Sequence, residues 1–306
     1  MRNFTFKGLL LTAVFMLLGC LSIQAANDDL ITKQITIKLD KAGTLPDRIG
    51  SGRKYQITNL KLVGEINGTD FRMIREMAGR DYRGDVTEGN LSVLDLSEAK
   101  IVEGGDYYIY TSFNYIYTSN DEIGSFAFYG CSGLKSLNLP AGITRISDYA
   151  FYGCSGLTSI TLHTGITSIG SYAFYGCSGL TSLNLPAGIT EISEGAFKGC
   201  SGLTSIYVYA EIVPKIGRDE FTGVDAKKCT LYVPMGTYSD YWLSDFGNYF
   251  ENIVEFDATG IDKTTISTDV EEVVRYSVNG QRLSAPTKGL NIVKYSDGSV
   301  KKVAVR

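Results

Sequence analysis

The hydrophobic positions of the chain recur at a fixed interval between Ile123 and Lys215. Four consecutive segments begin at Ile123, Ile146, Ile169 and Ile192; the first three are 23 residues long and the fourth has 24. Each places a leucine or isoleucine every few positions and contains the sequence GCSGL. A hydrophobic repeat with a period in the twenties is typical of a leucine-rich solenoid, in which each segment forms one coil. We therefore expect an α+β repeat protein with parallel β-strands on one face.

The third segment, which begins at Ile169, illustrates the expected division between core and surface. Its strand TSLNL alternates, so Ser182 and Asn184 should point outward from the sheet. Each buried aliphatic or aromatic side chain contributes about 1.5–3 kcal/mol, so a coil should be stable only when it is stacked on others. The inward set of this coil is predicted to be Ile169, Ala173, Phe174, Cys177, Leu180, Leu183, Leu185 and Ile189.

Equivalent outward residues of the four coils should form columns along the solenoid. One flanking column contains His163 and ends at Tyr209. A second display, Tyr129, Tyr152 and Tyr175, has a spacing that lets aromatic rings stack. We predict ligand binding on the strand columns, although solvated structural columns would look the same in sequence. The candidate ligand-binding residues are Asn138, Thr161, Asn184, Ser205, Tyr207 and Tyr209.

Cysteines occupy one position of every repeat. They are Cys131, Cys154, Cys177 and Cys200, and Cys229 follows in the next coil. An exported protein could form disulfides. However, equivalent residues of stacked coils lie about 4.8 Å apart and point the same way, which suits buried thiols better than disulfide geometry. We therefore predict a ladder of free, buried cysteines, which pack as small hydrophobic side chains.

The segments that flank the repeats share their pattern only in part. Residues 26–122 should form an irregular leucine-rich N-terminal cap, because a first coil with no neighbour would expose its apolar face. This cap is expected to contain a helix that begins at Thr69 or Asp70 and buries Phe71, Ile74 and Met77. Residues 216–257 read as a degenerate repeat and a C-terminal cap, in which Trp242 is expected to be a cap residue.

The stretch from Glu103 to Asn120 is unusually aromatic. It lacks aliphatic periodicity, and two interpretations remain open. It could be a loop that offers a contact surface, since tyrosine buries a large area at low entropic cost. Alternatively, it could be a distorted coil whose tyrosines simply pack. The aromatic residues are Tyr107, Tyr108, Tyr110, Phe113, Tyr115 and Tyr117.

The chain begins with the features of a targeting segment. Arg2 and Lys7 precede the apolar run GLLLTAVFMLLG, and small residues before Ala26 offer a cleavage site, so residues 1–25 should be a signal peptide. Alternatively, Cys20 in LLGC resembles a lipidation site. No later stretch reaches the roughly 18 apolar residues that span a membrane. We expect a secreted or cell-surface protein that could attach to the outer membrane by a lipid or by its C-terminal module.

That C-terminal module comprises residues 258–306. The sequence predicts a small β-rich domain here. Residues alternate before Asn279 and Gly280, which form a strong hairpin-turn pair, and a further strand is expected from Gly289 to Tyr295.

Charge and composition exclude several classes of function. A net charge of −4 and a pI near 5.2 give no basic surface for nucleic acid. His163 is the only histidine, so a histidine-based catalytic triad has one poor candidate. The repeat cysteines are too far apart in sequence, and too inward, for a zinc site. We therefore predict no catalytic residues, no metal site and no cofactor.

The repeat, in outline IxxxAFxxCxxLxxIxLPxxIxx, resembles the BspA-type (Treponema-type) leucine-rich repeats of bacterial surface and secreted proteins. INGTDFRMIREMAG and CTLYVPMGTYSDYW resemble the two caps of Bacteroides-type members. The C-terminal module is similar to a short β-module of exported Bacteroidetes proteins, and the similarity lies in VVRYSVNGQRL and KGLNIVKYSDGSVKKVAVR. The module is shorter than a full type IX sorting domain. The resemblance implies adhesion to host proteins or other cells, and it supplies no catalytic residues.

These observations predict an exported, non-enzymatic binding or adhesion module. The expected partner is a protein of a host matrix or another cell surface. Glycan binding through exposed tyrosines is an alternative, and so is a structural spacer role in a surface assembly.

Overall fold

The computed structural model describes residues 30–258, 272–277, 282–283, 289–295 and 300–305. It divides into two compact units, Met1–Asp257 and Ala258–Arg306. The predicted signal peptide, the lipidation candidate Cys20, and the turn at Asn279 and Gly280 lie outside the described residues.

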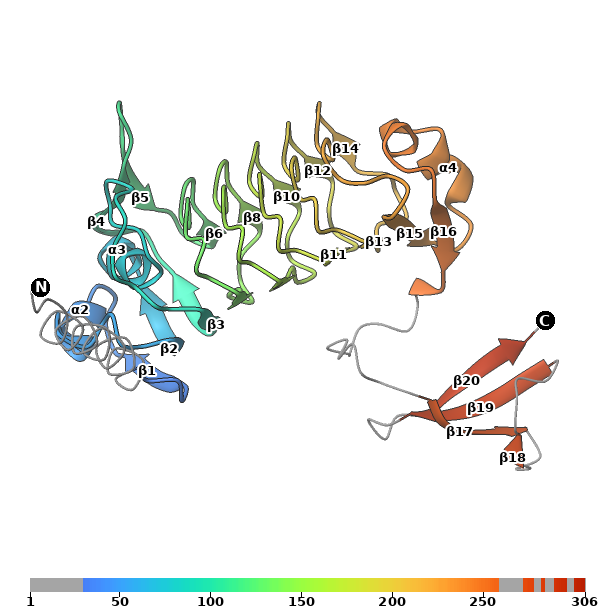
Figure 1. The fold of residues 1–306 in the computed structure, drawn as a ribbon, viewed down its shortest axis with the longest axis horizontal. Coiled ribbons are helices and arrows are strands. Elements are labelled where there is room, and N and C mark those ends of the chain that lie inside the picture. Colours follow the sequence, from blue (N-terminus) through green and yellow to red (C-terminus); the bar gives the residue numbers. More distant parts are fainter. Residues whose placement is uncertain (1–29, 259–271, 278–281, 284–288, 296–299, 306) are drawn as a thin grey trace, which may run out of the picture. The chain divides into compact units, whose positions relative to one another are not determined.

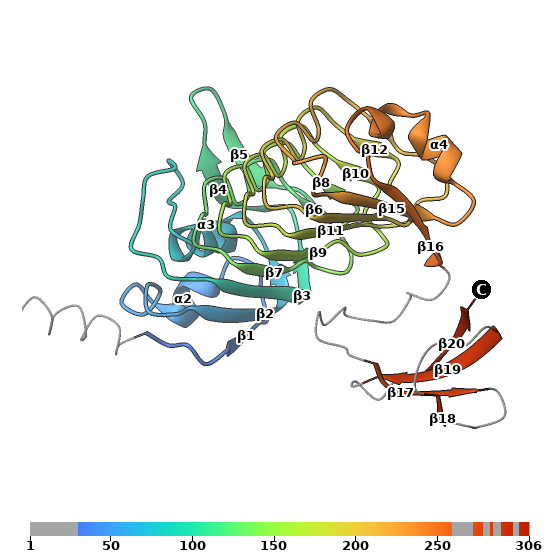
Figure 2. The ribbon, with the colours of Figure 1, turned by 45° about the vertical axis from the view of Figure 1, so that its right-hand side comes forward.

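The first unit is a solenoid of short parallel strands (Figure 1). Each regular coil contributes one strand to a main row and a two-residue strand to a second row, and Figure 2 shows both rows. The prediction of parallel strands on one face is confirmed, and the second row adds to it. The main row consists of two hydrogen-bonded sheets. The first is β1 (Ile35–Leu39), β2 (Asn59–Ile66), β3 (Val93–Ile101), β7 (Ser136–Asn138) and β9 (Ser159–Thr161), and the second is β11 (Ser182–Leu185), β13 (Ser205–Val208), β15 (Thr230–Pro234) and β16 (Ile253–Phe256). The second row is β6 (Glu122–Ile123), β8 (Arg145–Ile146), β10 (Ser168–Ile169), β12 (Glu191–Ile192) and β14 (Lys215–Ile216).

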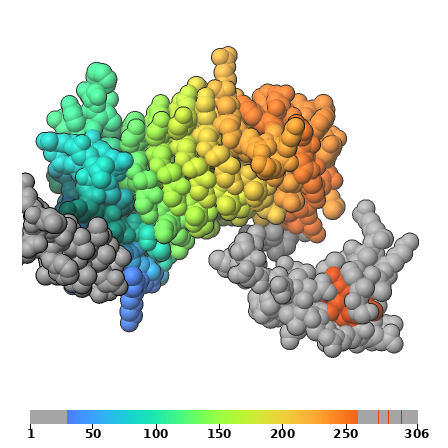
Figure 3. Space-filling model, in the orientation of Figure 1, coloured from blue at the N-terminus to red at the C-terminus, as the bar shows by residue number. Residues whose placement is uncertain are grey.

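The aromatic stretch before the first repeat forms an antiparallel hairpin. Its strands are β4 (Gly104–Tyr110) and β5 (Tyr115–Thr118), and its tip projects from the solenoid (Figures 1 and 3). Tyr108 is buried, whereas Tyr110, Tyr115 and Tyr117 are exposed. The stretch is thus a projecting hairpin and not a distorted coil. It packs one tyrosine inward and exposes the others, and its role as a contact surface remains a prediction.

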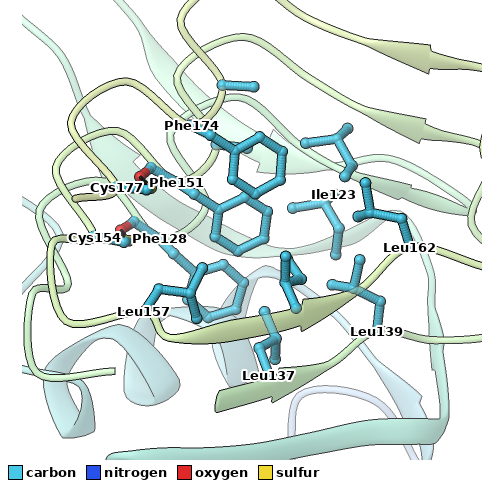
Figure 4. Packing of buried hydrophobic residues seen from close by; sticks show 14 of the residues in the cluster. Ile123, Phe128, Leu137, Leu139, Phe151, Cys154, Leu157, Leu162, Phe174 and Cys177 are labelled. Atoms are coloured by element: carbon cyan, nitrogen blue, oxygen red, sulfur yellow. Dashed lines mark hydrogen bonds between the residues drawn. The ribbon is translucent and has the colours of Figure 1, made fainter. Parts of the chain in front are cut away.

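The core consists of equivalent side chains stacked from coil to coil (Figure 4). One phenylalanine per coil forms a continuous stack, with neighbouring ring centroids 5.0–5.6 Å apart; these residues are Phe128, Phe151, Phe174, Phe197 and Phe221. The inward set predicted for the third coil is buried throughout. Because each ring packs against the next, a coil completes its core only in the stack.

The cysteine ladder is confirmed. Cys131, Cys154, Cys177, Cys200 and Cys229 are free and buried. The thiol of Cys154 donates to the carbonyl of Phe128 at 3.0 Å, and the next two thiols repeat this contact to the preceding coil at 3.2 and 3.1 Å. Each thiol therefore links two coils as well as filling space.

Backbone hydrogen bonds also join the coils: amides of one coil donate to carbonyls of the next. The carbonyls of the first coil therefore need donors from elsewhere. The Phe128 amide donates to the Ala150 carbonyl at 2.7 Å, and the next coils repeat this bond. Within residues 30–122, which the structure describes before this coil, there is no regular coil, so the N-terminal cap supplies donors for its carbonyls. The fully buried Arg75 donates to the carbonyls of Phe126 and Ala127 at 2.8 and 3.0 Å, and the Tyr108 hydroxyl donates to that of Ser125 at 2.7 Å.

The N-terminal cap contains α2 (Leu45–Ile49) and α3 (Gly68–Met77). The N-cap of α3 is Asn67, so the prediction of Thr69 or Asp70 is wrong by two or three residues. The Asn67 side chain accepts from the Thr69 amide at 3.1 Å, and the Asp70 carboxylate accepts from the Asn67 amide at 2.9 Å. Asp70 is thus the third helical residue of a capping box. Phe71, Ile74 and Met77 are buried as predicted.

The C-terminal cap contains α4 (Tyr238–Trp242) and the 3₁₀ helix η1 (Asp245–Asn248). Phe246 and Phe250 pack against Phe221, the last ring of the stack. Tyr241 is fully buried and its hydroxyl donates to the Ala210 carbonyl at 2.6 Å. Trp242 lies in this cap, as predicted, but it is 47% exposed, because α4 turns Tyr241 toward the core and the following residue away.

The second unit contains an antiparallel sheet in the order β18, β17, β19, β20. Its strands are β17 (Glu272–Ser277), β18 (Arg282–Leu283), β19 (Gly289–Tyr295) and β20 (Val300–Val305). Val293 of β19 is fully buried, so this unit has apolar packing of its own.

Candidate functional site

The strand columns lie along the main row, as expected from the alternation. Pairing sets Asn138 beside Thr161 and Asn184 beside Tyr207. Asn138 and Thr161 are exposed, but Asn184 is half-buried and its Oδ1 has no hydrogen-bond partner among the described residues. Ser205, also half-buried, donates to the Ser182 hydroxyl at 3.1 Å. Part of this face is therefore occupied by contacts between neighbouring coils.

The two tyrosines of the strand columns pack within the C-terminal end of the sheet. Tyr207 stacks on Tyr232 with centroids 4.3 Å apart, and Tyr209 meets Phe256 edge-on at 5.2 Å. Burial raises the pKa of both hydroxyls. These residues contribute to packing, and binding by the six predicted residues remains a prediction.

His163 and the repeat cysteines are engaged in structural contacts or buried. His163 Nε2 lies 2.5 Å from the Pro140 carbonyl of the preceding coil. Burial raises the pKa of the Cys200 thiol to about 12 and that of Cys229 to about 11. Within the described part of the chain, no group of three His, Cys, Asp or Glu residues could hold a metal ion. Among the same residues, no helix has the length and apolar character that crossing a membrane requires.

Two parallel aromatic ladders run along the coils on another face. The predicted column stacks as expected, with centroids 5.0 Å apart for Tyr129 and Tyr152 and 4.6 Å for Tyr152 and Tyr175. A second ladder, which the sequence reasoning missed, joins Phe126, Tyr149 and Tyr172 at 4.9 and 5.4 Å. The sequence feature that predicts the second ladder is an aromatic residue three positions before each tyrosine of the first ladder.

The second ladder has an unusual backbone. Phe126, Tyr149 and Tyr172 have φ of 60°, 57° and 54°, in the left-handed region that bulky residues rarely adopt. The fourth coil has Gly195 at this position with φ of 62°, a conformation that glycine adopts readily. The hydrogen bond from the Tyr172 hydroxyl to Glu194, at 2.7 Å, raises the pKa of Tyr172 to about 12. Aromatic rings are thus held in a row at some conformational cost.

The hairpin stands next to the first coils and carries its own aromatic cluster. Tyr115 packs against Tyr107 and Tyr110, with centroids 4.7 and 4.9 Å apart. The Arg72 guanidinium lies 3.9 Å from the Tyr82 ring centroid and 5.2 Å from that of Tyr107. The Tyr110 amide donates to the Tyr82 carbonyl at 2.7 Å, which fixes the hairpin to the preceding loop.

Two adjoining hollows lie around Tyr110, and we refer to them together as the aromatic groove. They share Arg83, Tyr110 and Ser112, and Arg83 is the only charged residue in either lining. The hollow toward the ladders, of about 400 Å³, is lined by Arg83, Gly84, Ile109, Tyr110, Thr111, Ser112, Phe126, Tyr129, Tyr149 and Tyr152. The hollow on the hairpin, of about 510 Å³, is lined by Tyr82, Arg83, Tyr107, Tyr110, Ser112 and Tyr115.

Comparison with known proteins identifies the repeat. The family described as "BspA type Leucine rich repeat region" matches six copies across residues 107–242, which extends the four predicted repeats in both directions. No curated protein sequence matches the chain.

Solved structures with similarity to the chain include two leucine-rich repeat proteins and a vaccine antigen. A leucine-rich repeat protein of T. pallidum is 25% identical, with a TM-score of 0.37, and the match covers 45% of this chain and 67% of that one. One from Bacteroides ovatus is 19% identical, with a TM-score of 0.32 and coverage of 74% and 66%. The pneumococcal vaccine antigen PcpA is 14% identical, with a TM-score of 0.29 and coverage of 65% and 57%. The chain thus spans less than two thirds of the last two structures. From its repeats and the family match, residues 107–242 of this chain are a leucine-rich repeat region of the BspA type.

Proposed function

We propose that this protein is an exported, non-enzymatic binding or adhesion module that recognises a protein partner in a host matrix or on another cell. The observation that supports this function is the aromatic groove, which gathers tyrosines from the hairpin, a loop and two coils. Tyrosine offers large, rigid contact area with a polar tip, and protein-binding surfaces are enriched in it. Exposed aromatic residues at the hairpin, with Phe113 92% and Tyr115 56% exposed, enlarge this surface.

The ladders favour a protein over a glycan. Their rings are nearly parallel and 4.6–5.4 Å apart, so each inner ring has both faces covered by its neighbours. A sugar that stacks on tyrosine needs an open ring face. Ring edges and hydroxyl groups instead suit the mixture of apolar side chains and backbone polar groups that a polypeptide offers.

The location of the protein outside the cell is part of this proposal. It rests on the predicted signal peptide and on the family resemblance. Mass spectrometry of the mature N-terminus distinguishes the two forms of export: a chain that starts at Ala26 indicates an ordinary cleaved signal, whereas a lipidated Cys20 indicates an outer-membrane lipoprotein. An N-terminus that retains Met1 would contradict export through this segment.

The proposed function can be tested by capture of serum and extracellular-matrix proteins on the immobilised mature protein. We compare a groove variant, Tyr110→Ser with Tyr115→Ser, and a strand-face variant, Asn138→Ala with Thr161→Ala. All four positions are exposed, so both variants should keep the wild-type circular dichroism spectrum. We expect the groove variant to lose capture at least about tenfold and the strand-face variant to retain it. The reverse result would move binding to the strand columns, and hits on a glycan array without protein capture would refute the proposal.

A further inference from the structure

We infer that the aromatic groove binds an extended acidic segment of the partner, and that Arg83 pairs with a carboxylate of this segment. This inference rests on the proposed function, because it specifies the chemistry of the partner at the same site.

The loop that carries Arg83 is held in place by its own hydrogen bonds. The Asp81 carboxylate accepts from the amides of Arg83 and Asp85 at 2.8 and 2.9 Å. Arg80 donates to the carbonyls of Gly84 and Gly130 at 3.1 and 3.0 Å, which ties the loop to the first coil. The backbone of Arg83 is therefore positioned at the groove before a partner arrives.

The guanidinium of Arg83 is available for a partner. Arg83 is exposed, and in the part of the chain that the structure describes it forms no ion pair. Its guanidinium lies 5.3 Å from the Tyr82 ring centroid, a contact that leaves its N–H donors free. Neither hollow has a carboxylate in its lining, and Arg83 is the one charged lining residue in an apolar and hydroxyl-rich setting. The Arg72 guanidinium, which lies against the Tyr82 and Tyr107 rings, adds a second positive charge beside the hollow on the hairpin. The planar donor fork of Arg83 matches a carboxylate in two parallel hydrogen bonds.

The rest of the groove suits an extended polypeptide. An extended segment leaves its amides and carbonyls without internal partners, and tyrosine hydroxyls can both donate and accept. Tyr110 and Ser112 lie where the two hollows meet, beside Arg83. We therefore place the carboxylate at this junction and apolar side chains of the same segment toward Phe126 and Tyr149. A sulfated or acidic glycan fits less well, because the ladders cover their ring faces and the linings hold a single cation.

The test uses a phage-displayed library of random 12-residue peptides as probe for the mature protein. Selected peptides should be enriched in Asp or Glu next to apolar residues. For a selected peptide, fluorescence polarisation should show about tenfold weaker binding when its acidic residue is changed to the matching amide, and a similar loss with Arg83→Glu. Arg145→Glu is the matched control, because Arg145 is exposed on β8 and absent from the groove lining, and it should bind like wild type. A peptide with Lys in place of the acidic residue should regain binding to Arg83→Glu.

The outcomes separate this inference from the proposed function. Selection that yields no peptides, or peptides without acidic residues, refutes the inference, and so does equal binding by the two arginine variants. If protein capture depends on Tyr110 and Tyr115 but not on Arg83, the proposed function stands and the acidic partner is wrong. If only glycans bind, both are wrong.

Discussion

The second glycine of the GCSGL sequence occupies the same structural position in four coils, but its surroundings differ between the coils. A Cβ added at Gly156 would lie 2.2 Å from the Ser132 carbonyl oxygen of the preceding coil, and one added at Gly202 would lie 2.3 Å from that of Ser178. A Cβ added at Gly133 meets nothing within 4 Å, because no regular coil precedes the first one. None of these three glycines has positive φ, so space alone distinguishes them. We therefore predict that Gly156→Ala destabilises the protein and that Gly133→Ala does not.

The magnitude follows from the distance that the coils must separate. Cβ contacts with backbone oxygen below 3.0 Å are essentially never observed, so Gly156→Ala requires a local shift of about 0.8 Å, the difference between 3.0 and 2.2 Å. Such a shift would stretch neighbouring bonds, such as that from the Thr158 amide to the Lys135 carbonyl at 2.9 Å. Overpacking of this kind costs about 1–3 kcal/mol. Replacing glycine by alanine reduces the conformational entropy of the unfolded chain, which stabilises the folded protein by about 0.4–1 kcal/mol. Gly133→Ala should show this effect alone. The two variants should thus differ by about 1–3 kcal/mol in unfolding free energy.

Equilibrium urea unfolding, followed by far-UV circular dichroism, measures this difference. Solenoids can unfold in parts, so hydrogen exchange of the Thr158 amide provides a local measurement beside the global one. We expect faster exchange at this amide in Gly156→Ala and wild-type exchange in Gly133→Ala. Equal unfolding midpoints for the two variants would refute the reasoning that close stacking between coils requires glycine at this position.

Two further predictions concern the cap and the thiols. Arg75→Met leaves the Ala127 carbonyl without a donor and removes one of the two donors to the Phe126 carbonyl, which also accepts from the Tyr129 amide. This change should cost about 1–3 kcal/mol, whereas Arg72→Met on the same helix should cost less than about 1 kcal/mol; equal losses in thermal denaturation would argue against the capping role. Burial raises the pKa of Cys200 to about 12 and of Cys229 to about 11, while unfolded thiols titrate near about 8.5. The unfolded chain therefore releases these protons first, and the unfolding free energy should fall between about pH 8 and about pH 10. Cys200→Ala should show a smaller fall in urea midpoint over this range, and an unchanged slope would contradict the assignment.

The candidate site was less predictable than the fold. The column of Tyr129, Tyr152 and Tyr175 could be read from the repeat, but the groove needs Tyr82 and Arg83, about 45 residues away in sequence from the first ladder. Arg75 of α3, and Arg80 in the loop between α3 and β3, donate hydrogen bonds to carbonyls of the first coil and so hold this loop beside it. No local sequence pattern predicts such a contact between distant parts of the chain.

The sequence by itself determined the coil, the direction of its side chains and the burial of its cysteines. Each copy repeats the same apolar positions, so the core of Phe174 and Cys177 follows from the period alone. Only the tertiary structure decided how equivalent residues differ. Gly133 and Gly156 stand in the same local sequence, yet one is free and the other is pressed against a neighbouring coil. The physical reason is that end coils lack one neighbour, and the caps that replace it bring side chains from distant parts of the chain.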